Sequence, residues 1–153
     1  TATSATRIAQ VPALLKSDGS IVSLDGSLPS FTNTISNFLY IVIWSRNHVG
    51  IMSSGNITPG GTVVWDFTTG STQVYNGVPG YKEIETGVWG MAAGDINADG
   101  NVDATDKSPL GWKVDAGKNG YLGADLNMNT QVSNKDKNDF LYPNFSKITQ
   151  VPN

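Results

Sequence analysis

The pattern of apolar and polar residues changes near residue 90 of this 153-residue chain. Before that point, short apolar runs alternate with turn signals such as Ser17-Asp18-Gly19 and Thr58-Pro59-Gly60-Gly61, at the spacing of antiparallel strands. We therefore expect residues 1–90 to form a mainly β unit, a β-sandwich with an extended N-terminal segment. Residues 91–153 are expected to form a second, smaller unit built from polar loops and short helices.

Two segments of the first unit have contrasting patterns. In residues 63–67, Val63, Trp65 and Phe67 share one parity and Asp66 lies on the other, which predicts a strand with one solvated face. Residues 38–44 are apolar at both parities, which predicts a strand covered on both faces. One cover would be the opposing sheet. The other would be the second unit, another element of the chain or a neighbouring molecule.

The second unit contains two twelve-residue loops, 95–106 and 125–136, that carry oxygen-bearing side chains at the same positions. Positions 1, 3, 5, 9 and 12 supply side chains and position 7 supplies a backbone carbonyl, which is the ligand spacing that calcium requires. Two matches in one chain make coincidence a poor explanation. The predicted ligands are Asp95, Asn97, Asp99, Asn101, Asp103 and Asp106 in the first loop, and Asp125, Asn127, Asn129, Gln131, Ser133 and Asp136 in the second.

The same residue types also form turns and helix caps without a metal. Ser133-x-x-Asp136 is a capping-box pattern, and Asp103-x-x-Asp106 is a looser version of it. The two roles are compatible, because the ligand at position 12 can lie in the first turn of the helix that follows. We predict such a helix over residues 135–142, ended by Pro143.

The two loops differ most at position 6, where the chain turns sharply with positive φ. Gly100 suits this conformation, whereas the β-branched Thr130 loses about 1 to 2 kcal/mol there. The second loop also has fewer carboxylates, so we expect the first site to bind calcium more tightly. Val102 and Val132, both at position 8, are expected to pair with each other across the two loops.

The Asp residues at position 12, together with the Gly94-Asp-x-Asn-x-Asp-Gly opening, resemble the duplicated calcium segments of dockerin modules over about residues 91–145. The resemblance implies two structural Ca2+ ions and one helix after each loop. It also implies a protein-binding surface of the cohesin-binding kind. The positions that match dockerin contact residues are Ala104, Thr105, Asn134 and Lys135.

Three other segments, 14–26, 46–52 and 136–144, resemble the C-terminal, non-catalytic modules of large secreted bacterial surface and adhesin-like proteins. This resemblance implies an immunoglobulin-like or transthyretin-like sandwich ahead of the calcium unit, and a secreted or cell-surface location. In those modules a further strand usually precedes the sandwich, and here it is absent or displaced. The fold is therefore expected to be completed by another chain or by upstream sequence.

A short N-terminal pattern recurs at the C-terminus. Arg7-Ile-Ala-Gln-Val-Pro12 and Lys147-Ile-Thr-Gln-Val-Pro152 share four identities and one basic-for-basic exchange. An extended segment ahead of a sandwich is suited to strand donation, in which a neighbouring chain supplies the edge hydrogen bonds. Ile8 and Val11 are then candidate contacts with a second copy, and a head-to-tail contact of this kind builds filaments.

Composition narrows the possible functions. The chain has no cysteine, so bound calcium is the candidate staple for the small second unit. His48 is the only histidine, which argues against a conventional zinc site or a Cys-His pair, and we expect no enzymatic activity. Lys and Arg are few and scattered, which argues against nucleic acid as a partner. No apolar stretch reaches the length of a membrane span.

Carbohydrate enters in two ways. Trp44, Trp65, Trp89 and Trp112 either build the core or offer platforms for sugar rings, and we favour the core. Asn56-Ile-Thr58 and Asn144-Phe-Ser146 match the acceptor pattern for N-linked glycans.

Together these features predict a secreted, non-catalytic, calcium-binding structural module of an extracellular assembly or surface appendage, with copies of itself or another extracellular protein as partner. The alternative is a dockerin-type protein-binding or carbohydrate-binding accessory module of a polysaccharide-degrading system.

Overall fold

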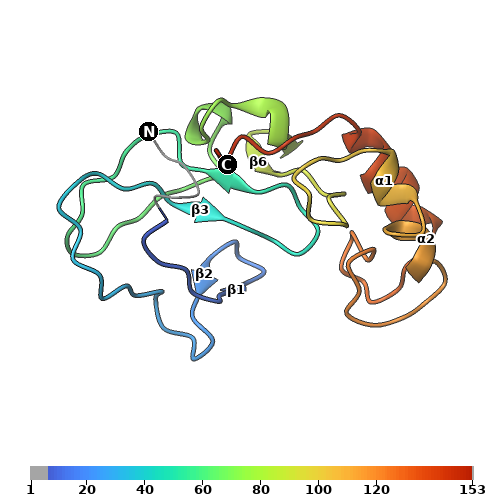
Figure 1. The fold of residues 1–153 in the computed structure, drawn as a ribbon, viewed down its shortest axis with the longest axis horizontal. Coiled ribbons are helices and arrows are strands. Elements are labelled where there is room, and N and C mark those ends of the chain that lie inside the picture. The colour runs from blue at the N-terminus through green and yellow to red at the C-terminus, as the bar shows by residue number, and fades with distance from the viewer. Residues whose placement is uncertain (1–6, 153) are drawn as a thin grey trace.

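The structure is a computed structural model that describes residues 7–152, and its regular elements are short (Figure 1). The strands are Leu14–Leu15 (β1), Ile21–Val22 (β2), Val42–Ile43 (β3), Ile51–Met52 (β4), Tyr81–Glu85 (β5) and Val88–Met91 (β6). The helical turns are Ser71–Gln73 (η2), Val78–Gly80 (η3), Ala104–Lys107 (α1), Trp112–Asp115 (α2), Asp136–Leu141 (η4) and Tyr142–Asn144 (η5). None of the helices in residues 7–152 has the length and apolar character needed to cross a membrane.

The strands form three separate two-stranded antiparallel sheets, β1–β2, β3–β4 and β5–β6. The β3–β4 ladder is extended by single bridges between Leu39 and Ile57 and between Ser53 and Val74. The mainly β character expected of the first unit is therefore present. Two sheets packed face to face are not seen within residues 7–152.

The predicted strand over residues 63–67 is wrong. No strand is assigned there, and Asp66 instead closes a turn by accepting hydrogen bonds from the backbone N–H and hydroxyl of Thr68 at 2.7 Å. The alternation is followed in part: Trp65 and Phe67 are half-buried and Val64 is 86% exposed, but Val63, predicted to share the buried face, is 38% exposed. A strand also needs a neighbouring strand for its backbone hydrogen bonds, and this segment has none among residues 7–152.

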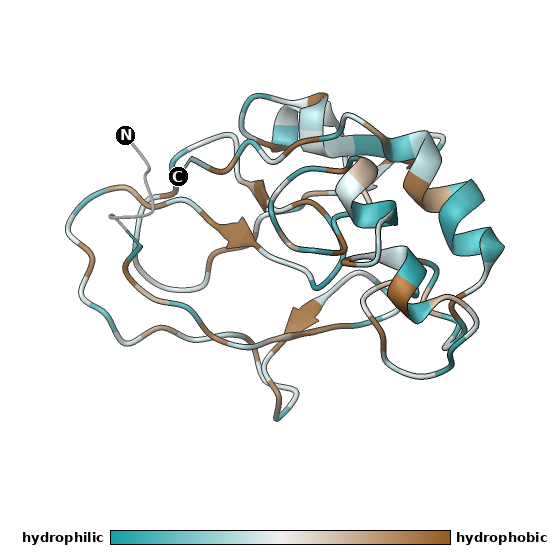
Figure 2. Cartoon of the chain, turned by 45° about the vertical axis from the view of Figure 1, so that its right-hand side comes forward, coloured by the Kyte–Doolittle hydropathy of each residue, from teal (hydrophilic) through white to brown (hydrophobic). Residues whose placement is uncertain are grey.

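The prediction that residues 38–44 are covered on both faces is wrong for the isolated chain. Phe38, Tyr40, Val42 and Trp44 are 62, 38, 37 and 52% exposed, whereas the alternate residues are half-buried. One face of this segment packs against the rest of the described chain, whereas the other is only partly covered. Figure 2 shows brown, apolar segments along the outer chain as well as at the centre.

Two hydrophobic clusters hold the molecule together. The first contains Ile51, Val74 and Tyr81 and is flanked by Ile43, Phe67, Trp89 and Met91. The second contains Val49, Ala92, Ala93, Val102, Leu126 and Leu141 and is flanked by Ile96, Trp112 and Phe140. Because Val49 belongs to the second cluster, contacts cross the boundary near residue 90.

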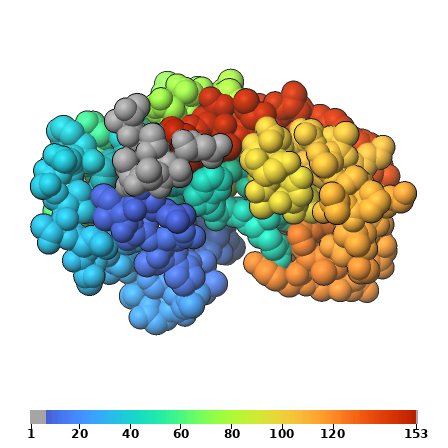
Figure 3. All heavy atoms as spheres, in the orientation of Figure 1, coloured from blue at the N-terminus to red at the C-terminus, as the bar shows by residue number. Residues whose placement is uncertain are grey.

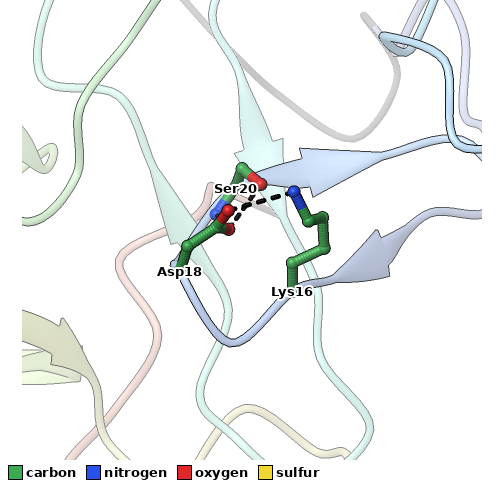
Figure 4. Close-up of polar contacts among 3 residues, drawn as sticks. All are labelled: Lys16, Asp18 and Ser20. Carbon is green, nitrogen blue, oxygen red and sulfur yellow. Dashed lines mark hydrogen bonds and ion pairs between the residues drawn. The ribbon is translucent and has the colours of Figure 1, made fainter.

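The β1–β2 hairpin lies at the periphery and forms a self-contained turn. Figure 4 shows Asp18 accepting hydrogen bonds from the backbone N–H and the hydroxyl of Ser20, at 2.9 and 2.6 Å, while Lys16 pairs with its other oxygen at 3.0 Å. These bonds hold the pKa of the Asp18 carboxyl below its usual range, with the Ser20 hydroxyl as the largest cause. In Figure 3 this blue segment lies across a notch from the orange residues of the second unit.

Candidate metal centre

The two loops adopt the same local fold. In the first, the Asp106 carboxylate accepts hydrogen bonds from the backbone N–H groups of positions 2, 3 and 9 at 2.7, 3.2 and 2.9 Å. In the second, Asp136 accepts the corresponding three bonds at 2.9, 3.2 and 2.8 Å. The carboxylate at position 12 therefore ties the start of each loop to its end.

The carboxylate at position 1 closes the turn of each loop. Asp95 Oδ2 accepts a hydrogen bond from Gly100 N–H at 3.0 Å, and Asp125 Oδ2 accepts one from Thr130 N–H at 2.8 Å. The carboxylates at positions 1 and 12 are all buried, and neither ion pair found within residues 7–152 involves them. Burying a carboxylate without a cation costs free energy, so a bound cation would stabilise each loop.

One oxygen marks the place where that charge would sit. Asp95 Oδ1 is buried and has no hydrogen-bond partner among the described residues. Burial raises the pKa of the Asp95 carboxyl to about 6; the Gly100 N–H opposes this effect, and the Asp106 and Asp99 carboxylates add to it. An unpartnered carboxylate oxygen next to other carboxylates fits a hard cation such as Ca2+.

The remaining candidate ligands of the first loop bond to one another or to the helix that follows. Asn97 Nδ2 donates to Asp99 Oδ2 at 2.8 Å, and Asp103 caps α1 by accepting from Thr105 N–H at 2.6 Å. Three acidic, cysteine or histidine side chains do not converge on one point anywhere in the described part of the chain. The donor set of each loop is instead a mixture of carboxylates, amides and backbone carbonyls.

The second loop shares this arrangement. Asn129 Oδ1 accepts from the N–H of Gln131 at 2.9 Å, and the hydroxyl of Ser133 donates to Asp136 Oδ2 at 3.2 Å. The amide oxygen of Asn127 accepts from Asn129 N–H at 3.0 Å. Asn101 in the first loop corresponds to Gln131, and each of them belongs to an isolated β-bridge.

Position 6 has the backbone conformation expected from the sequence, with φ of 87° at Gly100 and 70° at Thr130. We expect Thr130→Gly to raise the free energy of unfolding of the calcium-loaded chain by about 1 kcal/mol. The substitution removes a strain of about 1 to 2 kcal/mol, of which the greater freedom of glycine in the unfolded chain offsets about 0.5 kcal/mol. Urea unfolding in saturating calcium measures the change.

The matched control is Gly100→Ala. Its Cβ would lie 2.8 Å from Thr149 Cγ2, in a backbone conformation that already strains an L-residue, so stability should fall by about 1 to 2 kcal/mol. A Thr130→Gly chain that is less stable than the parent would contradict the strain argument.

The prediction that Val102 and Val132 pair with each other is wrong. Val102 N–H donates to the Lys147 carbonyl at 2.8 Å, and Val132 N–H donates to the Lys118 carbonyl at 2.9 Å. Both valine side chains are fully buried. Each loop therefore pairs with a different segment of the chain, and the two loops do not pair with each other at position 8.

Each loop pairs with the segment that follows the other loop and its helices. The segment 117–120, which follows the helices after the first loop, pairs with the second loop, and the segment 146–149, which follows the helix after the second loop, pairs with the first. Position 6 of each loop is also bonded to the paired segment: Thr149 N–H donates to the Gly100 carbonyl at 2.7 Å, and Gly120 N–H donates to the Thr130 carbonyl at 2.8 Å. Gly117 and Ser146 begin these segments with φ of 80° and 70°. Backbone hydrogen bonds thus link the two repeats to each other.

The helices that follow the loops begin at the candidate ligands. Asp103 and Asp106 form a capping box at the start of α1, as the weaker of the two sequence patterns predicted. The helix predicted over residues 135–142 corresponds to η4, but helical turns continue through Pro143 in η5. Proline is tolerated there because it occupies the first turn of that short helix.

Asn47 is the important residue that the sequence did not reveal. Its side chain is fully buried, and Nδ2 donates at 3.0 Å to the carbonyls of both Gly123 and Asp125, at the start of the second loop. Its Oδ1 lies 2.8 Å from Nδ1 of His48. Burial, with the Arg46 charge, lowers the pKa of His48 to about 4, so a neutral imidazole is available to support Asn47. An isolated Asn in a loop carries no sequence signal for this role.

The candidate partner and glycan residues differ in accessibility. The four dockerin-like contact positions Ala104, Thr105, Asn134 and Lys135 are exposed, and so are Ile8, Val11 and Asn56. Asn144 is only 2% exposed, donates from Nδ2 to the Ala93 carbonyl at 2.8 Å and accepts from Lys82 Nζ at 2.9 Å. The expectation of a glycan on Asn144 is therefore wrong for the folded chain, because its amide is committed to internal hydrogen bonds.

Comparison of the chain with protein-family models, curated proteins and solved structures finds no match. The function is therefore inferred from the chain's own residues and their geometry.

Proposed function

We propose that the chain is a secreted, non-catalytic structural module that holds two structural Ca2+ ions in a dockerin-like unit. The single observation that carries the calcium assignment is the buried, unpartnered Oδ1 of Asp95 within a loop of calcium-ligand spacing. The second loop repeats the backbone hydrogen bonds of the first, which supports a second ion there.

In this proposal calcium acts as a staple. The carboxylates at positions 1 and 12 are buried without cationic partners, and the chain has no disulfide to replace the missing stabilisation. Because each loop pairs with the segment that follows the other repeat, an ion in either loop strengthens both halves of the unit.

We further propose that the module self-assembles outside the cell, head to tail, by donating its N-terminal strand. The first unit exposes an unusual number of large apolar side chains for a soluble monomer. They include Ile8, Leu14, Leu15, Leu24, Leu28, Phe31, Phe38, Trp44 and Val64. A β-sandwich that is completed only when copies meet would bury this surface.

The test is electron microscopy and analytical ultracentrifugation of the purified chain in calcium and in chelator. We expect filaments or oligomers in calcium, and their loss when residues 1–12 are removed. A chain that stays strictly monomeric at high concentration with saturating calcium would overturn the assembly proposal. Calorimetry on Asp95→Ala and Asp125→Ala tests the ions separately, since each variant should lose one site.

The alternative function, a dockerin-type protein-binding module, is favoured by one observation: the four positions that match dockerin contacts are all exposed. The carbohydrate version has weaker support, since Trp89 and Trp112 pack against the two clusters and only Trp44 is mainly exposed. A pull-down against cohesins and a glycan array test these alternatives, and silence in both would remove them.

A further inference from the structure

One edge of β3 has no partner strand among residues 7–152. Leu39 exchanges backbone hydrogen bonds with Ile57, at 3.0 and 2.7 Å, and the Ile41 carbonyl accepts from Ser53 N–H at 2.9 Å. The odd-numbered residues therefore direct their backbone groups toward the following strand. The backbone of Tyr40, between them, forms no hydrogen bond with another described residue, and β3 is paired only with β4.

The same segment lacks the features that protect an exposed strand edge. Residues 38–44 contain no charged residue and no proline, and their even-numbered side chains, Phe38, Tyr40, Val42 and Trp44, are exposed. Soluble proteins usually block such an edge with charges, proline or a covering element, because it accepts strands from other chains. This edge therefore combines unpaired backbone groups with an apolar face.

The backbone of the N-terminal arm, residues 7–13, also lacks hydrogen-bond partners among residues 7–152. All of its residues are exposed, no secondary structure is assigned to it, and it forms no backbone hydrogen bond with another described residue. An extended segment with free backbone groups and exposed Ile8 and Val11 is suited to be added to a sheet edge.

The C-terminal copy of the same pattern shows what such a segment can do. Ile148 N–H donates to the Pro79 carbonyl at 3.0 Å, and Thr149 N–H donates to the Gly100 carbonyl at 2.7 Å. The Lys147 carbonyl accepts from Val102 N–H at 2.8 Å. Lys147-Ile-Thr-Gln-Val-Pro152 therefore pairs with backbone on both sides, whereas the similar Arg7-Ile-Ala-Gln-Val-Pro12 forms no backbone hydrogen bond with residues 7–152.

We propose that the acceptor of the N-terminal arm is the free edge of β3 in a second copy of this chain, where the arm adds a strand and the apolar side chains on one of its two faces lie beside those of Tyr40 and Val42. This inference rests on the proposed self-assembly and specifies its contact. Arm and edge are different surfaces, so the contact is heterologous: it builds a filament where the rotation between copies does not close and a ring where it does, whereas edge-to-edge pairing of two β3 strands would close as a dimer.

The absence of cysteine from the chain allows a direct test. Ala9→Cys and Gln10→Cys variants, whose side chains face opposite sides of the arm, are each mixed with Tyr40→Cys or Val42→Cys chains in saturating calcium under mild oxidation. We expect one arm variant to form a disulfide between chains with an edge variant, identified on a non-reducing gel and by mass spectrometry. Leu110→Cys, at a residue 75% exposed between α1 and α2, is the matched control and should remain unlinked.

A second variant tests the contact without cross-linking. Tyr40→Lys places a charge on the edge at an exposed position and should raise the concentration needed for assembly at least tenfold, with the thermal midpoint of the monomer unchanged. Leu110→Lys should leave assembly unaffected. Tyr40→Lys chains that assemble like the parent would overturn the inference.

The remaining outcomes separate the two proposals. If oligomers form and require residues 1–12, but no arm-to-edge disulfide appears, the acceptor is wrong and self-assembly stands. A disulfide that forms only between two Tyr40→Cys chains would show that two β3 edges pair with each other, and would overturn the proposal that the arm binds this edge. If no oligomer forms under any condition, self-assembly itself is wrong, and the acceptor with it.

Discussion

Removing calcium is expected to lower the midpoint of thermal unfolding by about 15 °C or more. Under linkage, an ion present at about a thousand times its dissociation constant stabilises the folded chain by about 4 kcal/mol per site. For a chain of this size, each kcal/mol shifts the midpoint by about 2 to 4 °C. The buried carboxylates Asp95, Asp106, Asp125 and Asp136 would otherwise stand without a cationic partner.

Circular dichroism melts in calcium, in EGTA, and in EGTA followed by excess calcium measure this effect and its reversal. Magnesium should restore little of it, because the ligands are spaced for a larger, more flexible coordination shell. Asp106→Ala and Asp136→Ala should each remove one site's share, while Asp139→Ala, an exposed acid on η4, should remove none. Identical midpoints in calcium and EGTA would show that the loops are turns and caps only.

The ions should also contribute unequally. The second loop has two carboxylates among its candidate ligands and holds Thr130 at positive φ, whereas the first has four carboxylates and Gly100. Asp95→Ala is therefore expected to lose more calcium-dependent stability than Asp125→Ala.

Features of the loops that depend on neighbouring residues could be predicted from the sequence. The capping box of Asp103 and Asp106 and the positive φ of Thr130 follow from residue type and spacing over a few positions, and both are present. The pairing of the loops could not be predicted, because it joins Val102 to Lys147, and no local pattern reports a partner so distant in the chain.

The first unit has the same division between local and distant features. Alternation correctly predicted that Trp65 and Phe67 are partly buried, but it failed for Val63, which is exposed, and it could not supply a partner strand for their backbone. Residues 38–44 have the composition of a strand covered on both sides, yet the described residues cover one side only in part. The apolar residues on both faces of this segment suit a strand that is covered on both sides, and in our proposal a second copy of the chain completes that cover.

The largest effect expected from a single residue outside the loops is that of Asn47→Ala. This change removes the amide that donates to the carbonyls of Gly123 and Asp125, and it also removes the oxygen that lies 2.8 Å from His48 Nδ1. Because these groups are buried, the free energy of unfolding should fall by about 2 to 4 kcal/mol.

The same substitution should weaken the second calcium site. The Asp125 carbonyl belongs to the residue at position 1 of that loop, so loss of its hydrogen bond frees the backbone that positions the first ligand. Urea unfolding and calorimetry in parallel separate the two consequences. Asn37→Ala, at an exposed asparagine of the first unit, is the control and should change neither. If Asn47→Ala lowered stability but left both calcium sites intact, Asn47 would join the two units without positioning the loop.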